Sequence, residues 1–285
     1  MRSEGLGGVQ KAVGVLWAAI VLLTGCAAPP KVGVKPSLSE WGADPASSRT
    51  LYRKSITYLD GGRQADAENT IVFACMDYPE VQRLLFLRGV LERSRFKTEQ
   101  SSGTFAQVYR LNPENLPGRT AHIVVSMDFG GDAEVGFDKL RALMDQHPDE
   151  PLLRWLYIIE AVGRQPYAEE ALRLCEELLQ EWKVGPVTLH KAYANFLVVV
   201  RNDLEAALEQ RMLAAEMEPV ANNYEGVART LERMEQYAEA EPVYAKMVEL
   251  EPDSAVRWFQ WGNCRAHLED YAGAAATFEK AHALD

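Results

Sequence analysis

The sequence has few of the side chains that most often build catalytic and metal centres. Among its 285 residues are only five histidines and four cysteines. No two of these histidines, and no histidine and cysteine, stand at a spacing typical of metal ligands. The histidines are His122, His147, His190, His267 and His282. We expect them on the surface or in satisfied core positions, and we predict no metal site and no cofactor.

The short motifs of nucleotide binding and nucleophilic catalysis are missing too. The sequence has no glycine-rich phosphate loop, no nucleophile elbow and no pattern typical of a catalytic triad. Residues 128–134 place acidic side chains around two glycines, as calcium loops do, but the twelve-residue frame and its terminal glutamate are absent. We interpret this stretch as a turn between helices, and we predict that the chain is not an enzyme.

Long apolar runs are also absent, because none approaches the roughly 20 residues that a membrane-spanning helix needs. The formal net charge is -11, so nucleic acid and anionic membrane surfaces are poor partners. A content of 47% hydrophobic and 25% charged residues is typical of a globular chain with a packed core. Proline is sparse in the second half, where alanine, leucine, glutamate and arginine dominate, and this favours helices.

The first 25 residues show, in order, the features of an export signal. Arg2 and Lys11 provide positive charge, and residues 12–23 form an apolar stretch too short to span a membrane. The sequence LTGC at residues 23–26 resembles the lipoprotein box of bacterial lipoproteins. This resemblance implies cleavage before Cys26 and acylation of that cysteine, which would anchor the chain stably. The alternative is an ordinary secretory signal with a cysteine near its end.

The residues after the cysteine bear on location and domain organisation. Ala27 stands where enteric bacteria use aspartate to retain lipoproteins in the inner membrane, so the outer membrane, on its periplasmic side, is favoured. Residues 26–47, rich in proline and small polar residues, are predicted to be the lipidated cysteine and a flexible tether. The folded domain is then expected over residues 48–285.

Internal repetition dominates residues 48–285. Pro79, Pro113 and Pro148 are 34 and 35 residues apart, and Pro252 follows Pro219 by 33. Turn sequences at residues 60–62, 130–132 and 235–236 separate pairs of helices. We count about seven units, each expected to be a helical hairpin that cannot bury its apolar face alone.

The last unit carries the clearest motif. Trp258, Gly262, Ala274 and Phe278 have the spacing of the tetratricopeptide pattern, so the chain resembles the tetratricopeptide repeat family. The resemblance implies an all-α fold, a right-handed α-solenoid of helix-turn-helix repeats. The β-branched residues 122–125 could instead form a strand, but turn signals on both sides and the lack of a partner strand favour a helix.

Three cysteines, Cys75, Cys175 and Cys264, fall in the first, fourth and seventh units. Because a solenoid unit contacts only its neighbours, no two of them can meet. We predict free and mostly buried thiols.

In the tetratricopeptide family the first helix of each unit lines a concave groove that binds partners. Transferred to this sequence, the groove residues are Tyr52, Phe86, Leu156, Phe196, Arg229, Phe259 and Asn263. This groove is apolar, with a charged patch around Arg229, and suits an apolar segment or an amphipathic helix of a protein partner. The alternative is that some of these residues pack against neighbouring units. Co-chaperone members clamp a terminal carboxylate with paired lysine and asparagine, a pattern that this register does not contain.

The last helix, with Phe278, Ala281 and Leu284, is predicted to leave an apolar face without the polar cap that solenoids need. A second copy of the chain, another partner or further residues of a longer chain would cover it. A homodimer through this helix is therefore one of three expectations.

The organisation as a whole resembles outer-membrane tetratricopeptide lipoproteins, among them pilotins of type IV pilus secretins and lipoproteins of exopolysaccharide export. The resemblance implies a non-catalytic scaffold of the cell envelope that helps to assemble a secretion, pilus or polysaccharide-export complex. The alternative is an accessory subunit of an envelope enzyme complex that acts on polysaccharide or peptidoglycan.

Overall fold

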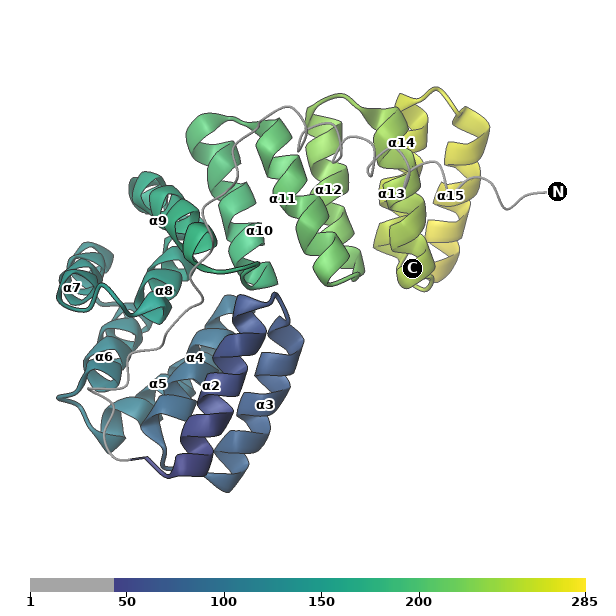
Figure 1. Ribbon diagram of the computed structural model, residues 1–285. Coiled ribbons are helices and arrows are strands. Elements are labelled where there is room, and N and C mark those ends of the chain that lie inside the picture. The colour runs from purple at the N-terminus through teal and green to yellow at the C-terminus, as the bar shows by residue number, and fades with distance from the viewer. Residues whose placement is uncertain (1–43) are drawn as a thin grey trace. The chain divides into compact units, whose positions relative to one another are not determined.

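The structure is a computed structural model that describes residues 44–285, and its regular elements are all helical. Consecutive helices pair into seven hairpins (Figure 1). They are α2 (Ala46–Asp60) with α3 (Gln64–Asp77), α4 (Gln82–Ser94) with α5 (Thr98–Leu111), α6 (Leu116–Asp128) with α7 (Ala133–Gln146), α8 (Pro151–Ala161) with α9 (Ala168–Glu181), α10 (Val187–Phe196) with α11 (Leu204–Met217), α12 (Ala221–Arg233) with α13 (Tyr237–Leu250), and α14 (Ala255–His267) with α15 (Tyr271–Leu284). The predicted all-α solenoid of about seven units is confirmed.

Two expectations about individual segments are settled by these elements. Residues 122–125 lie inside α6, so the strand alternative is wrong. Residues 129–132 form the turn between α6 and α7, so the segment 128–134 is a turn with its two helix ends. The Asp132 side chain accepts a hydrogen bond from the backbone N–H of Glu134 at 2.9 Å and caps α7. The predicted signal peptide, Cys26 and most of the tether lie outside the described residues. No helix in residues 44–285 is long and apolar enough to cross a bilayer.

Each hairpin turns on one residue with a left-handed backbone conformation. These residues are Gly62, Phe96, Gly130, Gly163, Asn202, Glu235 and Glu269, at successive spacings of 34, 34, 33, 39, 33 and 34 residues. A positive φ reverses the chain just after a helix and costs glycine least. The one long spacing shows that extra residues are inserted between the turns at Gly163 and Asn202, among them a 3₁₀ turn, η1 (Gln165–Tyr167), before α9.

Part of this insertion lengthens the first helix of the fifth unit. Pro186 precedes α10, which continues without a break into a π-helical segment, η2 (Leu197–Arg201). A π-turn takes up extra residues while keeping the helix axis continuous. As a result, the positions along α10 cannot be counted back from the turn at Asn202.

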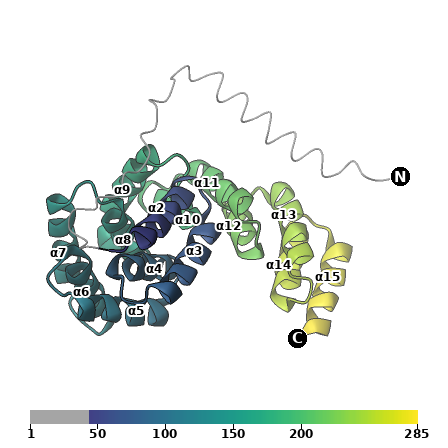
Figure 2. The same cartoon turned by 60° about the horizontal axis from the view of Figure 1, so that its bottom comes forward.

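The apolar core is divided into two clusters. One contains buried residues from Tyr52 to Ala207 and so runs through the first five units; the other extends from Ala215 to Cys264. Within the first cluster α4 contacts α8, two units further on, and both helices are buried over most of their length (Figure 2). The expectation that units contact only their neighbours is therefore wrong for the first five units.

A second departure from nearest-neighbour packing joins the first unit to the fifth. The Asp60 carboxylate accepts the backbone N–H of Lys183 at 2.8 Å, and the Asp60 carbonyl accepts that of Val184 at 2.9 Å. The side-chain oxygen of the buried Gln64 accepts hydrogen bonds from both the backbone N–H and the hydroxyl of Thr188, at 3.2 and 3.0 Å. We call these residues the closing contact, because they bring together segments more than 120 residues apart in the chain.

The three thiols are free, and all three are buried, as expected. Burial raises the pKa of Cys75 and of Cys264 to about 11. They are therefore uncharged at neutral pH and behave as small apolar side chains.

The final helix does not present the apolar face that was predicted to be open. Ala281 is buried, Phe278 and Leu284 are half-buried, and the Phe278 ring lies 5.4 Å from that of Phe259 on α14. This face is covered to a large extent by α14, because the two helices of a hairpin pack through it. The homodimer remains a prediction.

A polar cavity between the fifth and sixth units

The seven predicted groove residues fall into two groups. Tyr52, Phe86, Leu156 and Phe196 are all at most 3% exposed, whereas Phe259 is 53% exposed and Arg229 and Asn263 are also exposed. The predicted residues thus do not form one continuous accessible groove. Only those of the sixth and seventh units lie where a partner can reach them without displacing the core.

Two physical causes account for the buried group. In the first four units the inner helices pack on one another, because α4 contacts α2, α6 and α8, so Tyr52, Phe86 and Leu156 fill the core. In the fifth unit the cause is a slip of one residue in register. Phe196 and Ala192 point into the core, and the residues that precede them, Asn195 and Lys191, face outward.

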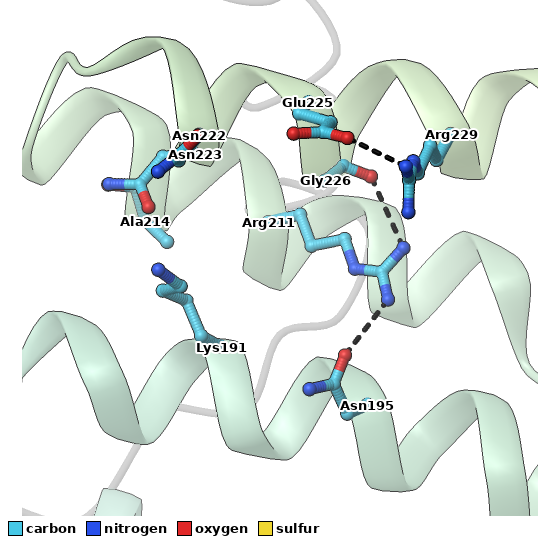
Figure 3. Close-up of a pocket in the computed structure, with 9 residues that line it drawn as sticks. All are labelled: Lys191, Asn195, Arg211, Ala214, Asn222, Asn223, Glu225, Gly226 and Arg229. Atoms are coloured by element: carbon cyan, nitrogen blue, oxygen red, sulfur yellow. Dashed lines mark hydrogen bonds and ion pairs between the residues drawn. The ribbon is translucent and has the colours of Figure 1, made fainter. Parts of the chain in front are cut away.

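Lys191 and Asn195 are one helical turn apart on α10 and line a cavity of about 280 Å³. The cavity lies between α10, α11 and α12 (Figure 3). Its lining residues are Lys191, Asn195, Arg211, Ala214, Asn222, Asn223, Glu225, Gly226 and Arg229. Almost all of them are polar or charged, unlike the apolar groove that the sequence predicts.

Arg211 is the central cation of this cavity. Its guanidinium donates to the Asn195 side-chain oxygen at 3.0 Å, to the Gly226 carbonyl at 3.2 Å and to the Thr230 hydroxyl. These acceptors are neutral, and no ion pair within the described part of the chain involves Arg211. Burial lowers the pKa of Arg211 from its ordinary value, and the positive charges of Arg233 and Arg229 lower it further.

Lys191 is the second cation of the cavity and reaches it from α10 (Figure 3). No hydrogen bond or ion pair with any of residues 44–285 holds its ammonium group. Burial lowers the pKa of Lys191, and nearby Arg95 lowers it further, while the more favourable charge of Glu218 offsets only part of the effect. Lys191 is thus a half-buried cation that lacks a directly bound anion.

The one carboxylate that lines the cavity is already engaged. Glu225 accepts hydrogen bonds from Arg257 at 2.7 Å and from Gln260 at 3.1 Å, and it pairs with Arg229 at 2.7 Å. Burial alone would raise the pKa of Glu225, but these donors lower it overall. Glu225 is therefore ionised at neutral pH, and its charge is shared between two arginines.

The lysine and asparagine of α10 correct the sequence-based reading of this surface. The predicted register contains no paired lysine and asparagine at the groove positions, but Lys191 and Asn195 occupy those positions in the fifth unit. Pro186 is a signal of the true register, because it directly precedes α10 and a proline near the start of a unit marks where its first helix begins. Arg211 comes from a second helix, and its position carries no signal in the repeat pattern.

Metal ligands are not grouped in this region. Within residues 44–285 no three histidine, cysteine or acidic side chains are placed to hold a metal ion. The cavity instead offers N–H donors and positive charge. Asn222 and Asn223, which line the cavity, lie in the first turn of α12, so the positive end of that helix dipole is also close to the cavity.

Comparison with known proteins finds similarity to solved structures alone. No family profile matches the chain, and no curated protein matches it in sequence. A tetratricopeptide repeat protein from Parabacteroides merdae superposes with a TM-score of 0.44 and 18% identity over 84% of this chain and 94% of its own. YrrB, a tetratricopeptide protein with an unusual peptide-binding site, gives 0.44 and 15% identity over 75% of this chain and 92% of its own.

A higher score is obtained with human IFIT1, solved as a dimer with PPP-AAAA. Its TM-score is 0.54 at 16% identity, over 83% of this chain, which spans 59% of the IFIT1 chain. Identity this low demonstrates the fold alone. The seven hairpins with their regular left-handed turns show an α-solenoid of repeated helix pairs, and the similarity to IFIT1 supports this fold.

Proposed function

We propose that this protein is a lipid-anchored scaffold of the cell envelope that binds a protein partner on the first-helix face of its last three units. That face runs from α10 across α12 to α14. In this account Cys26 carries the lipid, residues 26–47 form the tether, and the solenoid presents the face on the periplasmic side of the outer membrane. The scaffold would help to assemble a secretion, pilus or polysaccharide-export complex.

The observation that carries the proposal is the contrast between the two ends of the solenoid. First helices of the early units are buried in the core, while α10, α12 and α14 expose donors, charges and an aromatic side chain. Phe259 is 53% exposed, and the charged Arg229 lies one unit before it. An aromatic anchor next to a polar rim is the composition that protein interfaces favour.

The test of partner binding uses two exposed phenylalanines as a matched pair. Phe259, at 53% exposure, lies on the proposed face; Phe73, at 67%, lies on α3. We expect Phe259→Ala to reduce capture of the partner from detergent-solubilised envelopes at least tenfold and Phe73→Ala to leave it unchanged. Equal capture by both variants would refute this face as the binding surface.

The captured proteins also separate two kinds of scaffold. Secretin- or pilin-type partners would support a role in assembly, and synthases or hydrolases would indicate the accessory subunit of an envelope enzyme complex. Anchoring is tested independently: incorporation of labelled palmitate should be lost in Cys26→Ser and kept in Cys75→Ser, whose cysteine is buried in the solenoid.

A further inference from the structure

Two half-buried cations without a bound anion face the same cavity. Arg211 is held by neutral oxygen atoms of Asn195, Gly226 and Thr230, and Lys191 makes no hydrogen bond or ion pair with residues 44–285. Buried positive charge without a counterion is costly, so such charges are normally paired. An arginine that only joins three helices would account for Arg211, but it would leave Lys191 unexplained.

The charges that line the cavity do not balance. Lys191, Arg211 and Arg229 are positive, and Glu225 is the one acidic side chain among the nine lining residues. Glu225 pairs with Arg229 and with Arg257 of the seventh unit, both at 2.7 Å, so among the lining residues it leaves Lys191 and Arg211 uncompensated. A local excess of about two positive charges therefore stands out in a chain whose formal net charge is -11.

We propose that this cavity binds a phosphate monoester group, through Lys191, Arg211 and Asn195. This inference rests on the proposed function, since it names the chemistry of the group that the partner places at one end of the binding face.

A phosphate monoester fits the cavity better than a carboxylate does. It carries close to two negative charges at neutral pH, which match the excess of positive charge, and a carboxylate carries one. Its three terminal oxygens can accept donors from several directions, and here the donors arrive from α10, α11 and the first turn of α12. A cavity of about 280 Å³ is small for a whole ligand and suits one group of a larger partner.

Two of the five guanidinium N–H groups of Arg211 remain to bind the anion. Three N–H groups are used by Asn195, Gly226 and Thr230, and these contacts fix the plane of the guanidinium. A guanidinium already oriented loses little further freedom when an oxyanion binds.

The first experiment uses inorganic anions and does not need the partner. Binding of phosphate, sulfate and acetate to the purified solenoid is measured by calorimetry at constant ionic strength. We expect phosphate and sulfate to bind at least tenfold more tightly than acetate. We also expect phosphate to bind more weakly at pH 5 than at pH 7.5, because it loses one charge. Equal binding of acetate and phosphate would overturn the proposal.

Two lysines provide the variant and its control. Lys191→Met removes a side chain without hydrogen bonds, so the fold should persist, and phosphate affinity should fall at least tenfold. Lys246→Met removes the same charge from α13, outside the cavity, and should change nothing. Arg211→Met should abolish binding too, with circular dichroism to confirm the helices. Unchanged affinity in Lys191→Met would exclude the proposed site.

The source of the phosphate is decided by three further probes. A phosphorylated protein is represented by a phosphoserine peptide with an amidated end. A glycan or lipid headgroup is represented by glycerol phosphate, and the free ion by inorganic phosphate. Tightest binding of any one identifies the source. If a peptide with a free carboxylate end binds more tightly than all three, the phosphate assignment is wrong. The two proposals can be distinguished in Phe259→Ala. If this variant loses partner capture but keeps phosphate binding, the partner-binding face and the phosphate site are separate features, and each is supported by its own assay.

Discussion

Phe96 is the residue whose type fits its backbone conformation least well. It closes the second hairpin at a φ of 58°, and its side chain is 66% exposed, so little packing repays the left-handed conformation. That conformation costs a residue with a Cβ roughly 1–2 kcal/mol. We expect Phe96→Gly to raise the free energy of unfolding by about 1 kcal/mol, as measured by urea denaturation.

The third hairpin supplies the reverse substitution as a control. Gly130 has a φ of 89°, and an added Cβ would meet no atom within 4 Å. Gly130→Ala should therefore lower the free energy of unfolding by about 1 kcal/mol through backbone strain alone. A destabilised Phe96→Gly would mean that the phenylalanine ring makes a stabilising contact that outweighs its strain.

The buried thiols predict a loss of stability at alkaline pH. The pKa of Cys75 and of Cys264 rises from 9.0 to about 11 on folding, because burial disfavours the thiolate. Their contribution is thus fully present below pH 9 and is lost as the pH rises through 11, where the unfolded chain has released both protons. We expect the free energy of unfolding to fall by about 2 kcal/mol per thiol over this range.

Chemical denaturation at pH 8 and at pH 11 measures this loss. Cys264→Ala should be less stable than the parent at pH 8, because it leaves a small cavity, and should lose less between the two pH values. An equal loss in the variant would show that other groups cause the alkaline dependence.

At the level of the helices, the sequence predicts best those hairpins that have both a proline at the unit boundary and a turn sequence between the two helices. Pro79, Pro113 and Pro148 mark unit boundaries, and the turn sequences at residues 60–62 and 130–132 end helices where predicted. A proline and a glycine act on the local backbone, so their effect can be recognised from the chain alone. This is why the number of units and the class of fold could be predicted.

The closing contact and the cavity could not be predicted, because both depend on how far the solenoid curls. In the sequence, Asp60 and Gln64 are ordinary polar residues beside a turn, and only the folded chain brings residues 183–188 into contact with them. Lys191 and Asn195 were missed by one residue, since the extra residues between the turns at Gly163 and Asn202 break the regular spacing of the repeats. Arg211 acts from a second helix, and the repeat pattern assigns groove positions to first helices.

The closing contact can be tested by one alanine at its tightest point. Gly62 has a φ of 75°, and a Cβ there would lie 2.8 Å from Val184 Cγ1 and 2.9 Å from Met217 Cε. We expect Gly62→Ala to lower the free energy of unfolding by about 1 kcal/mol more than Gly130→Ala, which has the same strain without the clash. Equal effects of the two alanines in urea denaturation would show that the side chains at the closing contact move aside without a cost in stability.

Across the whole solenoid, the two cores differ in how many connections hold them. The first five units are joined by α4–α8 packing, by the closing contact and by Arg95, which binds Glu68 at 2.8 Å and Glu218 at 2.7 Å. Burial alone would raise the pKa of Glu218, but Arg95 lowers it overall, as expected of a formed ion pair. Helices α12 to α15 pack mainly against their chain neighbours, and the ion pair of Arg257 on α14 with Glu225 on α12 joins only adjacent units.

This difference predicts where the chain opens first. In a linear array, an end unit can unfold by losing one interface, whereas a unit in a closed set must lose several at once. We expect native-state hydrogen exchange to be fastest in α14 and α15 and slowest in α4 and α8. Gly62→Ala should accelerate exchange in α2 and α3 and leave α14 and α15 unchanged. Equal protection of the backbone amides in all seven units would contradict this prediction. It would mean that the last two units unfold only when the first five units also unfold.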